Sequence, residues 1–373
     1  MSEHLRRDVA PRDIGARRST SRPGEHGTPD PSEGGGRPAR LSRGATFFLL
    51  ALACLAVAVG YVIWAALRSQ ATAAGPRPSP VPVSAGGAEA IGAVEREPHL
   101  VFQNVVRDEN YAKIALAPLS APNGPRTMTS LVCERVHYAA GQGLCLLPEK
   151  GLVSRLQAQI FGPDFQPHHT IPLNGSPTRA RVSPDGRYAA ATAFVYGHSY
   201  ADANFSTQTT IIDIASGTHL GDLERFAVSR NGQRWRAPDF NLWGVTFARD
   251  SNRFYATLRT GGKTYLVEGD VAARSVRVLR ENVECPSLSP DNTRIAFKKL
   301  IGEGPAWRLH VLDLATMTDR PTSETRSIDD QVEWLDDKQI VYAFGADLWV
   351  AAAEGNGRPR MLVSQALSPA VVR

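Results

Sequence analysis

Apolar and polar residues alternate over short runs in the second half of the chain, and each run follows a turn that carries an aspartate. The four copies are SPDGRYAAATAF (183–194), ARDSNRFYATL (248–258), SPDNTRIAFKK (289–299) and WLDDKQIVYAF (334–344). Runs of β-branched and aromatic residues with partial alternation are typical of strands. The preceding Pro, Asp and Gly favour a tight turn, because Pro presets φ and an Asp side chain accepts backbone N–H groups.

These turns recur at intervals that predict the fold class. The turn residues Asp185, Asp250, Asp291 and Asp336 are 65, 41 and 45 residues apart. A second Asp-apolar-Ala element follows the first three turns after 28, 20 and 22 residues. A repeated unit of about 40–45 residues made of short strands is the signature of a β-propeller blade. A single blade cannot bury both faces, so blades must stack until a ring closes.

Two further candidate blades lie upstream, in residues 98–180, without a clean turn signal. Their strands are expected within 113–131 and 143–173. Four clear units and two degenerate ones predict an all-β, six-bladed propeller. The long 65-residue interval predicts insertions at 199–206 and 223–239. Because a ring leaves no open end sheets, one blade should combine strands from both ends of the domain, with 100–105 or 362–372 supplying the missing partner.

Composition divides the chain into four zones. Residues 1–44 are rich in Arg, Gly, Pro and Ser and predict a disordered cytoplasmic tail. Residues 45–67 contain no charged residue, and at about 1.5 Å per residue they can cross a hydrocarbon core of roughly 30 Å, as a single transmembrane signal-anchor helix would. Residues 68–97 read as a Pro/Ala/Gly-rich linker, and residues 98–373 as the extracytoplasmic propeller domain.

The charges that flank the apolar run predict its orientation. Three arginines precede it without an intervening acid and two follow it: Arg37, Arg40, Arg43, Arg68 and Arg77. This bias favours a cytoplasmic N-terminus and a propeller on the outer face of the cell membrane. A cleaved signal peptide is the alternative, since Ala71, Thr72 and Ala73 offer a small-residue cleavage site. A 44-residue segment before the run and the length of the run itself favour the uncleaved anchor.

Charge and cysteines indicate the compartment rather than an activity. The net charge is +5, and residues 1–44 contribute nine Arg against six Asp or Glu, so no nucleic-acid partner is predicted. Cys133 and Cys145 flank a predicted hairpin turn and are expected to form a disulfide in an oxidising compartment. Cys285 is left over and is interpreted as a packed core thiol.

The repeats also resemble a known family. Units of the form SPDG-strand followed by a VLDLAT-like element, at 183–194, 289–299 and 310–316, resemble the repeats of TolB-type six-bladed propellers. The whole chain looks like membrane-anchored TolB-like translocation proteins of high-GC bacteria. This resemblance implies a propeller that binds envelope proteins or peptides, as TolB binds lipoproteins and colicins. The chain departs from TolB in having a tail and an apolar run where that family has an N-terminal α/β domain.

Motifs for chemistry are nearly absent from the sequence. It contains no G-x-S-x-G nucleophile elbow, and the pair His168–His169 lacks the H-E-x-x-H spacing of a zinc site. No cofactor, metal ligand or catalytic residue is therefore predicted. In a propeller the innermost strand precedes the turn, so residues seven and six positions before each turn Asp should ring one rim of the channel. They are Thr178 and Arg179, Trp243 and Gly244, Glu284 and Cys285, and Asp329 and Asp330.

This rim is the predicted binding site, and two function classes remain open for it. The first is a non-catalytic, membrane-anchored binding or scaffold module for an envelope protein, a peptide or a small polar ligand. Thr178, Arg179, Trp243, Glu284, Asp329 and Asp330 would contact that ligand. The alternative is a propeller-type hydrolase or lyase using rim carboxylates and His198. The lack of a His/Asp cluster at repeated positions favours the first class, and a solvated rim around a water-filled funnel is also compatible with the pattern.

Overall fold

The computed structural model describes two separate compact units, one within residues 1–77 and one within 78–373. The residues described are 42–73, 82–84, 87–149, 155–197, 199–201, 204–302, 304, 306–355 and 357–373. Most of the predicted tail (1–41), part of the predicted linker and His198 lie outside them.

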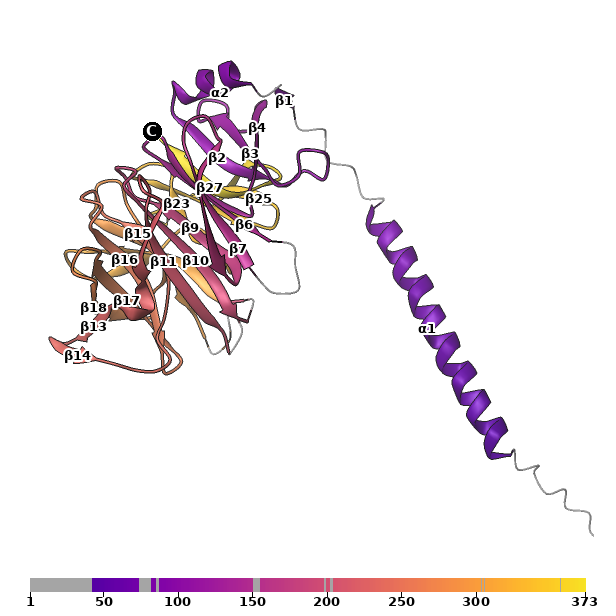
Figure 1. The fold of residues 1–373 in the computed structure, drawn as a ribbon. Helices are drawn as coiled ribbons and strands as arrows, with labels where there is room; N and C mark the ends of the chain where they lie inside the picture. Colours follow the sequence, from indigo (N-terminus) through magenta and orange to yellow (C-terminus); the bar gives the residue numbers. More distant parts are fainter. Residues whose placement is uncertain are drawn as a thin grey trace, which may run out of the picture. The chain divides into compact units, whose positions relative to one another are not determined.

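The first unit contains one long helix, α1 (Arg43–Ala73). Its segment Phe47–Trp64 has a mean hydropathy of 2.5 and no residue buried against the protein. By length and composition this segment can cross a membrane, so it is a candidate transmembrane span. The helix is longer than the apolar run of 45–67, because it extends through the polar residues that follow (Figure 1).

The second unit is a six-bladed propeller, as the repeats predict. Each blade is one mainly antiparallel sheet, and its innermost strand lines the channel. Blade 1 runs from its outer edge inward through β1 (Val83–Ser84), β4 (Arg126–Val132), β3 (Lys113–Pro118), β2 (His99–Asn104) and β27 (Ala366–Val372). Blade 2 runs from the channel outward through β5 (Arg135–Ala139), β6 (Gln142–Pro148), β7 (Arg155–Phe161) and β8 (Pro167–Asn174). Blade 3 likewise contains β9 (Ser176–Val182), β10 (Tyr188–Tyr196), β11 (Ser206–Asp213) and β12 (Thr218–Asp222).

The remaining three blades complete the ring (Figure 1). Blade 4 is β15 (Asn241–Phe247), β16 (Arg253–Thr260), β17 (Lys263–Asp270) and β18 (Ser275–Glu281), extended by β13 (Ala227–Arg230) and β14 (Gln233–Trp235). Blade 5 is β19 (Glu284–Leu288), β20 (Arg294–Leu300), β21 (Trp307–Asp313) and β22 (Asp319–Pro321). Blade 6 is β23 (Glu333–Trp334), β24 (Gln339–Phe344), β25 (Asp347–Ala352) and β26 (Arg360–Val363). Successive inner strands contact one another, and β23 contacts β27, so the ring is closed.

The predicted closure by both ends of the domain is confirmed. β27 pairs antiparallel with β2, with Val371 opposite Leu100 and Ala366 opposite Asn104. The C-terminal strand is thereby the innermost strand of blade 1. The fully buried guanidinium of Arg126 holds the same junction, donating to Asn104 Oδ1 at 2.6 Å and to the backbone oxygen of Gln365 at 2.9 Å.

The turn aspartates cap their turns as the sequence indicates. Asp185 Oδ1 accepts the N–H of Arg187 at 2.9 Å and the hydroxyl of Ser183 at 2.7 Å. Asp291 repeats this with the N–H of Thr293 at 3.0 Å. Gly186 has φ +73, a conformation that glycine adopts freely. Each turn therefore fixes the step from the inner strand to the second strand of its blade.

Of the two predicted insertions, the one at 199–206 lies between β10 and β11 of blade 3, and the one at 223–239 forms ordered structure at the outer edge of blade 4. A short 3-10 helix, η1 (Leu223–Arg225), leads into the hairpin β13–β14. β13 pairs parallel with β18, so the hairpin widens the blade to six strands (Figure 1). Within the range predicted as linker, β1 pairs with β4 and α2 (Ala88–Glu95) buries Val94 against the core of blade 1.

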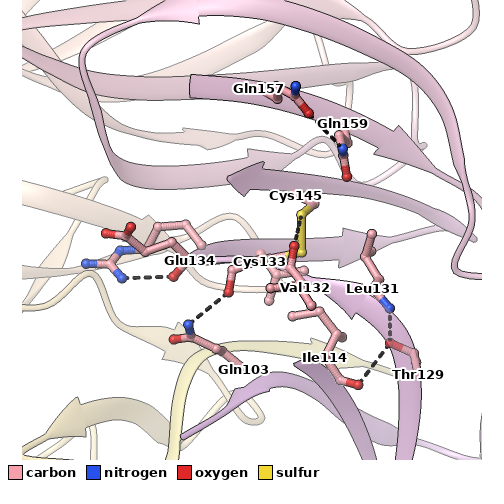
Figure 2. Close-up of a disulfide and its surroundings, with 12 residues drawn as sticks. Gln103, Ile114, Thr129, Leu131, Val132, Cys133, Glu134, Cys145, Gln157 and Gln159 are labelled. Carbon is pink, nitrogen blue, oxygen red and sulfur yellow. Dashed lines mark hydrogen bonds between the residues drawn. A yellow bond between two sulfur atoms is a disulfide. The ribbon is translucent and has the colours of Figure 1, made fainter. Parts of the chain in front are cut away.

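Cys133 and Cys145 form a disulfide, with their Cα atoms 5.4 Å apart (Figure 2). Cys133 follows the last residue of β4 and Cys145 lies in β6, so the bond links the end of blade 1 to the second strand of blade 2. The backbone oxygen of Cys133 accepts a hydrogen bond from Gln103 Nε2 of β2 at 2.8 Å (Figure 2). The two blades that lack an Asp turn are thus joined covalently.

Candidate functional site

The inner strands all begin at one end of the channel, and charged side chains gather there. A cavity of about 340 Å³ opens between the starts of β5 and β9, the loop before β23, and β27; we call it the mouth cavity. Its polar lining includes Arg135, Thr178, Arg179, Asp329, Asp330 and Ser368. Four of the six residues predicted to contact the ligand therefore line one cavity.

The other two predicted residues, Trp243 and Glu284, line a neighbouring cavity of about 410 Å³, which we call the side cavity. Its walls are mainly aromatic, and Tyr200, Phe205 and Trp307 join Trp243 there. Burial raises the pKa of the Glu284 carboxyl, although the nearby ammonium of Lys298 opposes this shift. The predicted rim thus consists of two adjacent hollows rather than one even ring.

Lys298 of β20 connects the two cavities. Its side chain is completely buried, and Nζ forms an ion pair with Asp329 and lies 3.8 Å from Glu284 Oε2. Nζ also lies 4.2 Å from the centre of the Trp307 ring, a cation–π distance. Asp329 is 40 % exposed; burial raises the pKa of its carboxyl, but the charges of Lys298 and Arg179 outweigh this and hold the pKa below its usual range.

Tyr200 is the second link between the cavities. Its hydroxyl accepts a hydrogen bond from Thr178 Oγ1 at 3.1 Å. Its ring stacks on Trp243 with centroids 5.0 Å apart, and the guanidinium carbon of Arg179 lies 5.1 Å from the ring centre. The predicted residues Thr178, Arg179 and Trp243 therefore belong to one contact network.

Sequence reasoning missed three members of this network: Arg135, Lys298 and Tyr200. The rim positions were found by counting back from each turn Asp. The first turn of blade 2, at Ala140 and Gly141, has no Asp, so this count could not identify Arg135. Tyr200 lies in an insertion between β10 and β11, outside the repeat. A signal for Lys298 exists, because it is in phase with the buried Ala296 in the alternation of β20, where a lysine side chain must find a partner.

The remaining two rim positions, Gly244 and Cys285, make a close backbone contact. A Cβ at Gly244 would lie 2.8 Å from Cys285 Cα, and Gly244 has φ +66. The Cys285 thiol is buried in the aromatic cluster, and its Sγ lies 3.9 Å from Arg179 Nη2. Gly244 therefore allows the inner strands of blades 4 and 5 to approach.

One layer deeper in the channel lies a second charged group, which we call the central triad: His137, Arg181 and Glu333. Arg181 forms an ion pair with Glu333, and His137 Nε2 lies 3.6 Å from the same carboxylate oxygen. Val182 N–H donates to His137 Nδ1 at 3.1 Å, and Arg181 Nη1 lies 2.9 Å from His137 Nε2. Burial raises the pKa of Glu333, but Arg181 and His137 outweigh it and hold the pKa at about 2.

The alternative hydrolase or lyase hypothesis receives little geometric support. His198 lies outside the described residues. Glu284 and Asp329 both lie within 4 Å of Lys298, so the two rim carboxylates have a permanent counter-charge. Within the described part of the chain, no group of three or more His, Cys, Asp or Glu side chains is placed to hold a metal ion.

Comparison with known proteins identifies the fold. No family model matches the sequence. No curated protein matches it either. Among solved structures, TolB from Acinetobacter baumannii is similar at a TM-score of 0.53 and 15 % identity, over 74 % of this chain and 67 % of that one. A putative TolB from Agrobacterium tumefaciens has a TM-score of 0.43 at 11 % identity over 73 % of this chain and 90 % of its own.

The likeness is one of fold. At 15 % identity the similarity to TolB covers the propeller architecture that the repeats predict. A chain of a nidogen/laminin complex is a more distant neighbour, with a TM-score of 0.46 and 12 % identity over 74 % of this chain and 98 % of that one. Structural neighbours of this chain are thus TolB-like propellers at low sequence identity, and function has to be argued from the site.

Proposed function

We propose that this protein is a membrane-anchored, non-catalytic binding or scaffold module, which takes an envelope protein, a peptide or a small polar ligand at the channel mouth. The observation that carries this proposal is the pair of adjacent cavities where the inner strands begin, lined by charged and aromatic side chains. Concave sites with a few convergent polar groups are the usual places for ligands. A TolB-like propeller fold agrees with a binding module.

The domain organisation is part of the proposal. Residues 1–44 would form a cytoplasmic tail, 45–67 the anchor and 98–373 the propeller on the outer face of the cell membrane. The tether would be the chain between the anchor and β1, because β1 and α2, within the range 68–97, pack on blade 1. The arginines before the apolar run support this orientation. The disulfide agrees with an oxidising compartment.

Protease digestion of intact cells, or of spheroplasts where a wall blocks access, tests the orientation. We expect external protease to degrade a C-terminal tag and the propeller while an N-terminal tag survives. Non-reducing peptide mapping of the same material should recover Cys133 and Cys145 as one bridged pair and Cys285 as a free thiol. A protected C-terminal tag together with an accessible N-terminal tag would contradict the proposed orientation.

Site-specific photo-crosslinking in membranes tests the binding site. A photoreactive phenylalanine at Phe344, which lines the mouth cavity and is 37 % exposed, replaces one aromatic ring with another. We expect it to give a discrete crosslinked species. The control position is Thr293, exposed in an Asp turn at the opposite end of the inner strands. Equal crosslinking from both positions, or none from Phe344, would rule out the mouth as the binding site.

A further inference from the structure

Two arginine side chains at the mouth converge on a single oxygen atom. Arg135 Nε and Arg179 Nη1 donate to the backbone oxygen of Thr178, at 3.0 and 2.8 Å. Arg135 Nη1 also donates to the backbone oxygen of Glu134 at 2.9 Å, and Arg179 lies against the Tyr200 ring. These contacts hold two positive charges side by side in fixed positions at the wall of the mouth cavity.

Neither guanidinium has a carboxylate partner in the described part of the protein. The other cations of the channel do: Arg181 pairs with Glu333, and Lys298 with Asp329. The remaining acid of the mouth cavity, Asp330, uses Oδ2 to accept the N–H of Ala343 at 2.9 Å. Every acid that lines the cavity is therefore engaged by another group, while both guanidiniums keep N–H donors that no carboxylate receives.

Burial affects the two guanidiniums differently: at Arg179 it is outweighed by nearby acidic groups, Cys285 and Tyr200 first and then Asp330 and Asp329, which raise the pKa. Burial lowers the pKa of Arg135, and the charge of Arg179 lowers it further, although Glu134 and Asp330 act in the other direction. Arg179 Nε is a buried donor with no hydrogen-bond partner among the described residues. Burying a donor without an acceptor costs about 1–3 kcal/mol, and more for a charged group. An anion between the two side chains would supply an acceptor for Arg179 Nε and a counter-charge for Arg135.

We propose that Arg135 and Arg179 form a carboxylate-binding site at the channel mouth. This inference rests on the proposed function and names the chemistry that the mouth recognises. A carboxylate has two oxygens that match the planar N–H fork of a guanidinium, so one group can bridge both arginines. The cavity of about 340 Å³ is also lined by Phe344 and Gly345, which are both exposed to solvent. Either a small organic acid or the C-terminal carboxylate of a peptide can supply this chemistry.

The decisive experiment compares an acid with its amide on the full-length protein in nanodiscs. The probes are acetyl-trialanine with a free C-terminus, the same peptide as its C-terminal amide, and propionate, each titrated by calorimetry. We expect saturable binding of the free acid and loss of binding by the amide. If propionate binds as tightly as the peptide, the source is a small organic acid; if the peptide binds more tightly, it is a chain terminus. This comparison needs no variant, so it remains decisive even if variants fold poorly.

Variants then locate the site. Arg135→Gln and Arg179→Gln should each weaken binding of the free acid by roughly ten-fold to a hundred-fold, the range for a charged hydrogen bond. Arg179→Lys keeps the charge without the planar fork and should fall in between. The matched control is Arg187→Gln, since Arg187 also lies over a tyrosine ring, 4.8 Å from the centre, but follows the Asp185 turn at the other end of β9. Binding in that control should be unchanged.

The experiments distinguish the absence of a carboxylate site from the absence of a macromolecular partner at the mouth. Equal affinity for acid and amide, or full affinity in Arg179→Gln, would overturn the carboxylate site. If crosslinking from Phe344 persists in that situation, the mouth still binds a partner through other groups. If the free acid binds but Phe344 gives no crosslink, the carboxylate site stands and the proposed macromolecular partner is wrong.

Discussion

The arginines of the mouth and the arginine of the central triad lie on the same two strands, one layer apart. They differ in whether a carboxylate pairs with them. On β9, Arg179 and Arg181 are two residues apart and so point to the same side of the strand. On β5, Arg135 and His137 have the same relation. In the deeper layer the cation has an acid, because Arg181 pairs with Glu333. In the outer layer neither arginine has one in the described structure.

We interpret the paired arginine as a charge that stabilises the fold, and the unpaired arginines as charges available to bind a ligand. A buried ion pair that lacks one partner is strongly destabilised, so the fold supplies Glu333 beside the buried Arg181, which borders the inner part of the mouth cavity together with His137. At the mouth, dissolved ions or a ligand can supply the counter-charge, and neither Arg135 nor Arg179 forms an ion pair with a described carboxylate. Four predictions test this contrast, from the largest expected effect to the smallest.

Replacing Glu333 should give the largest loss of stability. Glu333→Gln leaves the buried charge of Arg181 without its counter-charge, and we expect the free energy of unfolding to fall by about 3–5 kcal/mol. Chemical denaturation of the purified protein measures this change. The matched control is Asp330→Asn, because Asp330 lies in the loop just before the same inner strand, forms no ion pair within 4 Å among the described residues and accepts the backbone N–H of Ala343 in β24. A loss in the control as large as that in Glu333→Gln would remove the contrast.

The central triad should also make stability depend on pH. The pKa of Glu333 is held at about 2, below its unfolded value, so its stabilising contribution is complete above about pH 4.5 and is lost as pH falls toward 2. Burial and Arg181 lower the pKa of His137, so its protonation also destabilises the fold as pH drops below about 6.5. The shift of Glu333 alone, from 4.5 to about 2, should lower stability by roughly 3 kcal/mol across this window, at about 1.4 kcal/mol per pKa unit, and protonation of His137 adds to this loss.

The difference between wild type and Glu333→Gln isolates this contribution from other titrating groups. Burial raises the pKa of Glu224 to about 8, so that side chain destabilises the protein as pH rises from about 4.5 to 8, the opposite direction. Urea midpoints measured from pH 3 to pH 8 should show a smaller acid-induced fall in the variant. If the urea midpoints of the two proteins fall equally as pH decreases, the central triad does not cause the loss of stability at acid pH.

Removing both charges of the triad should cost far less than removing one. Arg181→Met combined with Glu333→Leu takes away the ion pair and fills its space with apolar side chains, a change that is often neutral in other proteins. We expect the double variant to regain most of the stability that Glu333→Gln loses, to within about 2 kcal/mol of wild type. A double variant less stable than Glu333→Gln would show that the pair itself holds the inner strands together.

The smallest effect is expected at the mouth. Arg135→Gln removes one of two neighbouring positive charges, so relief of repulsion offsets the lost hydrogen bonds. Its free energy of unfolding should stay within about 1 kcal/mol of wild type. Denaturation at low and high salt sharpens the test, because added salt should stabilise the wild type more than the variant by screening this pair. A loss comparable to that in Glu333→Gln would make Arg135 a structural charge like Arg181.

The features of the fold and of the site that could be predicted from the sequence are those tied to its repeats. The turn aspartates have a fixed offset to the channel, and counting back from them led to Thr178, Arg179, Trp243, Glu284, Asp329 and Asp330, which the structure places at two adjoining cavities. The closure of blade 1 by β27 follows from the need to satisfy sheet edges. These features are periodic or topological, and a single sequence carries both kinds of information.

Ion pairs between side chains of different blades could not be predicted from the sequence. Arg181 and Glu333 are 152 residues apart, and nothing local connects them. Lys298 reaches Asp329 across the step from blade 5 to the loop before β23. Such contacts depend on the rotation between successive blades, which the repeat length alone does not specify. The compensated and uncompensated charges of the channel could therefore be told apart only in three dimensions.

The pairing of β2 with β27 has a consequence for the order in which the chain is made. β2 leaves the ribosome early, whereas the strand that covers its inner edge comes from residues 366–372. Until β27 has been synthesised, blade 1 presents an uncovered edge that can pair with other chains. Pairing of β27 therefore ends the period in which the nascent chain is open to association with its neighbours.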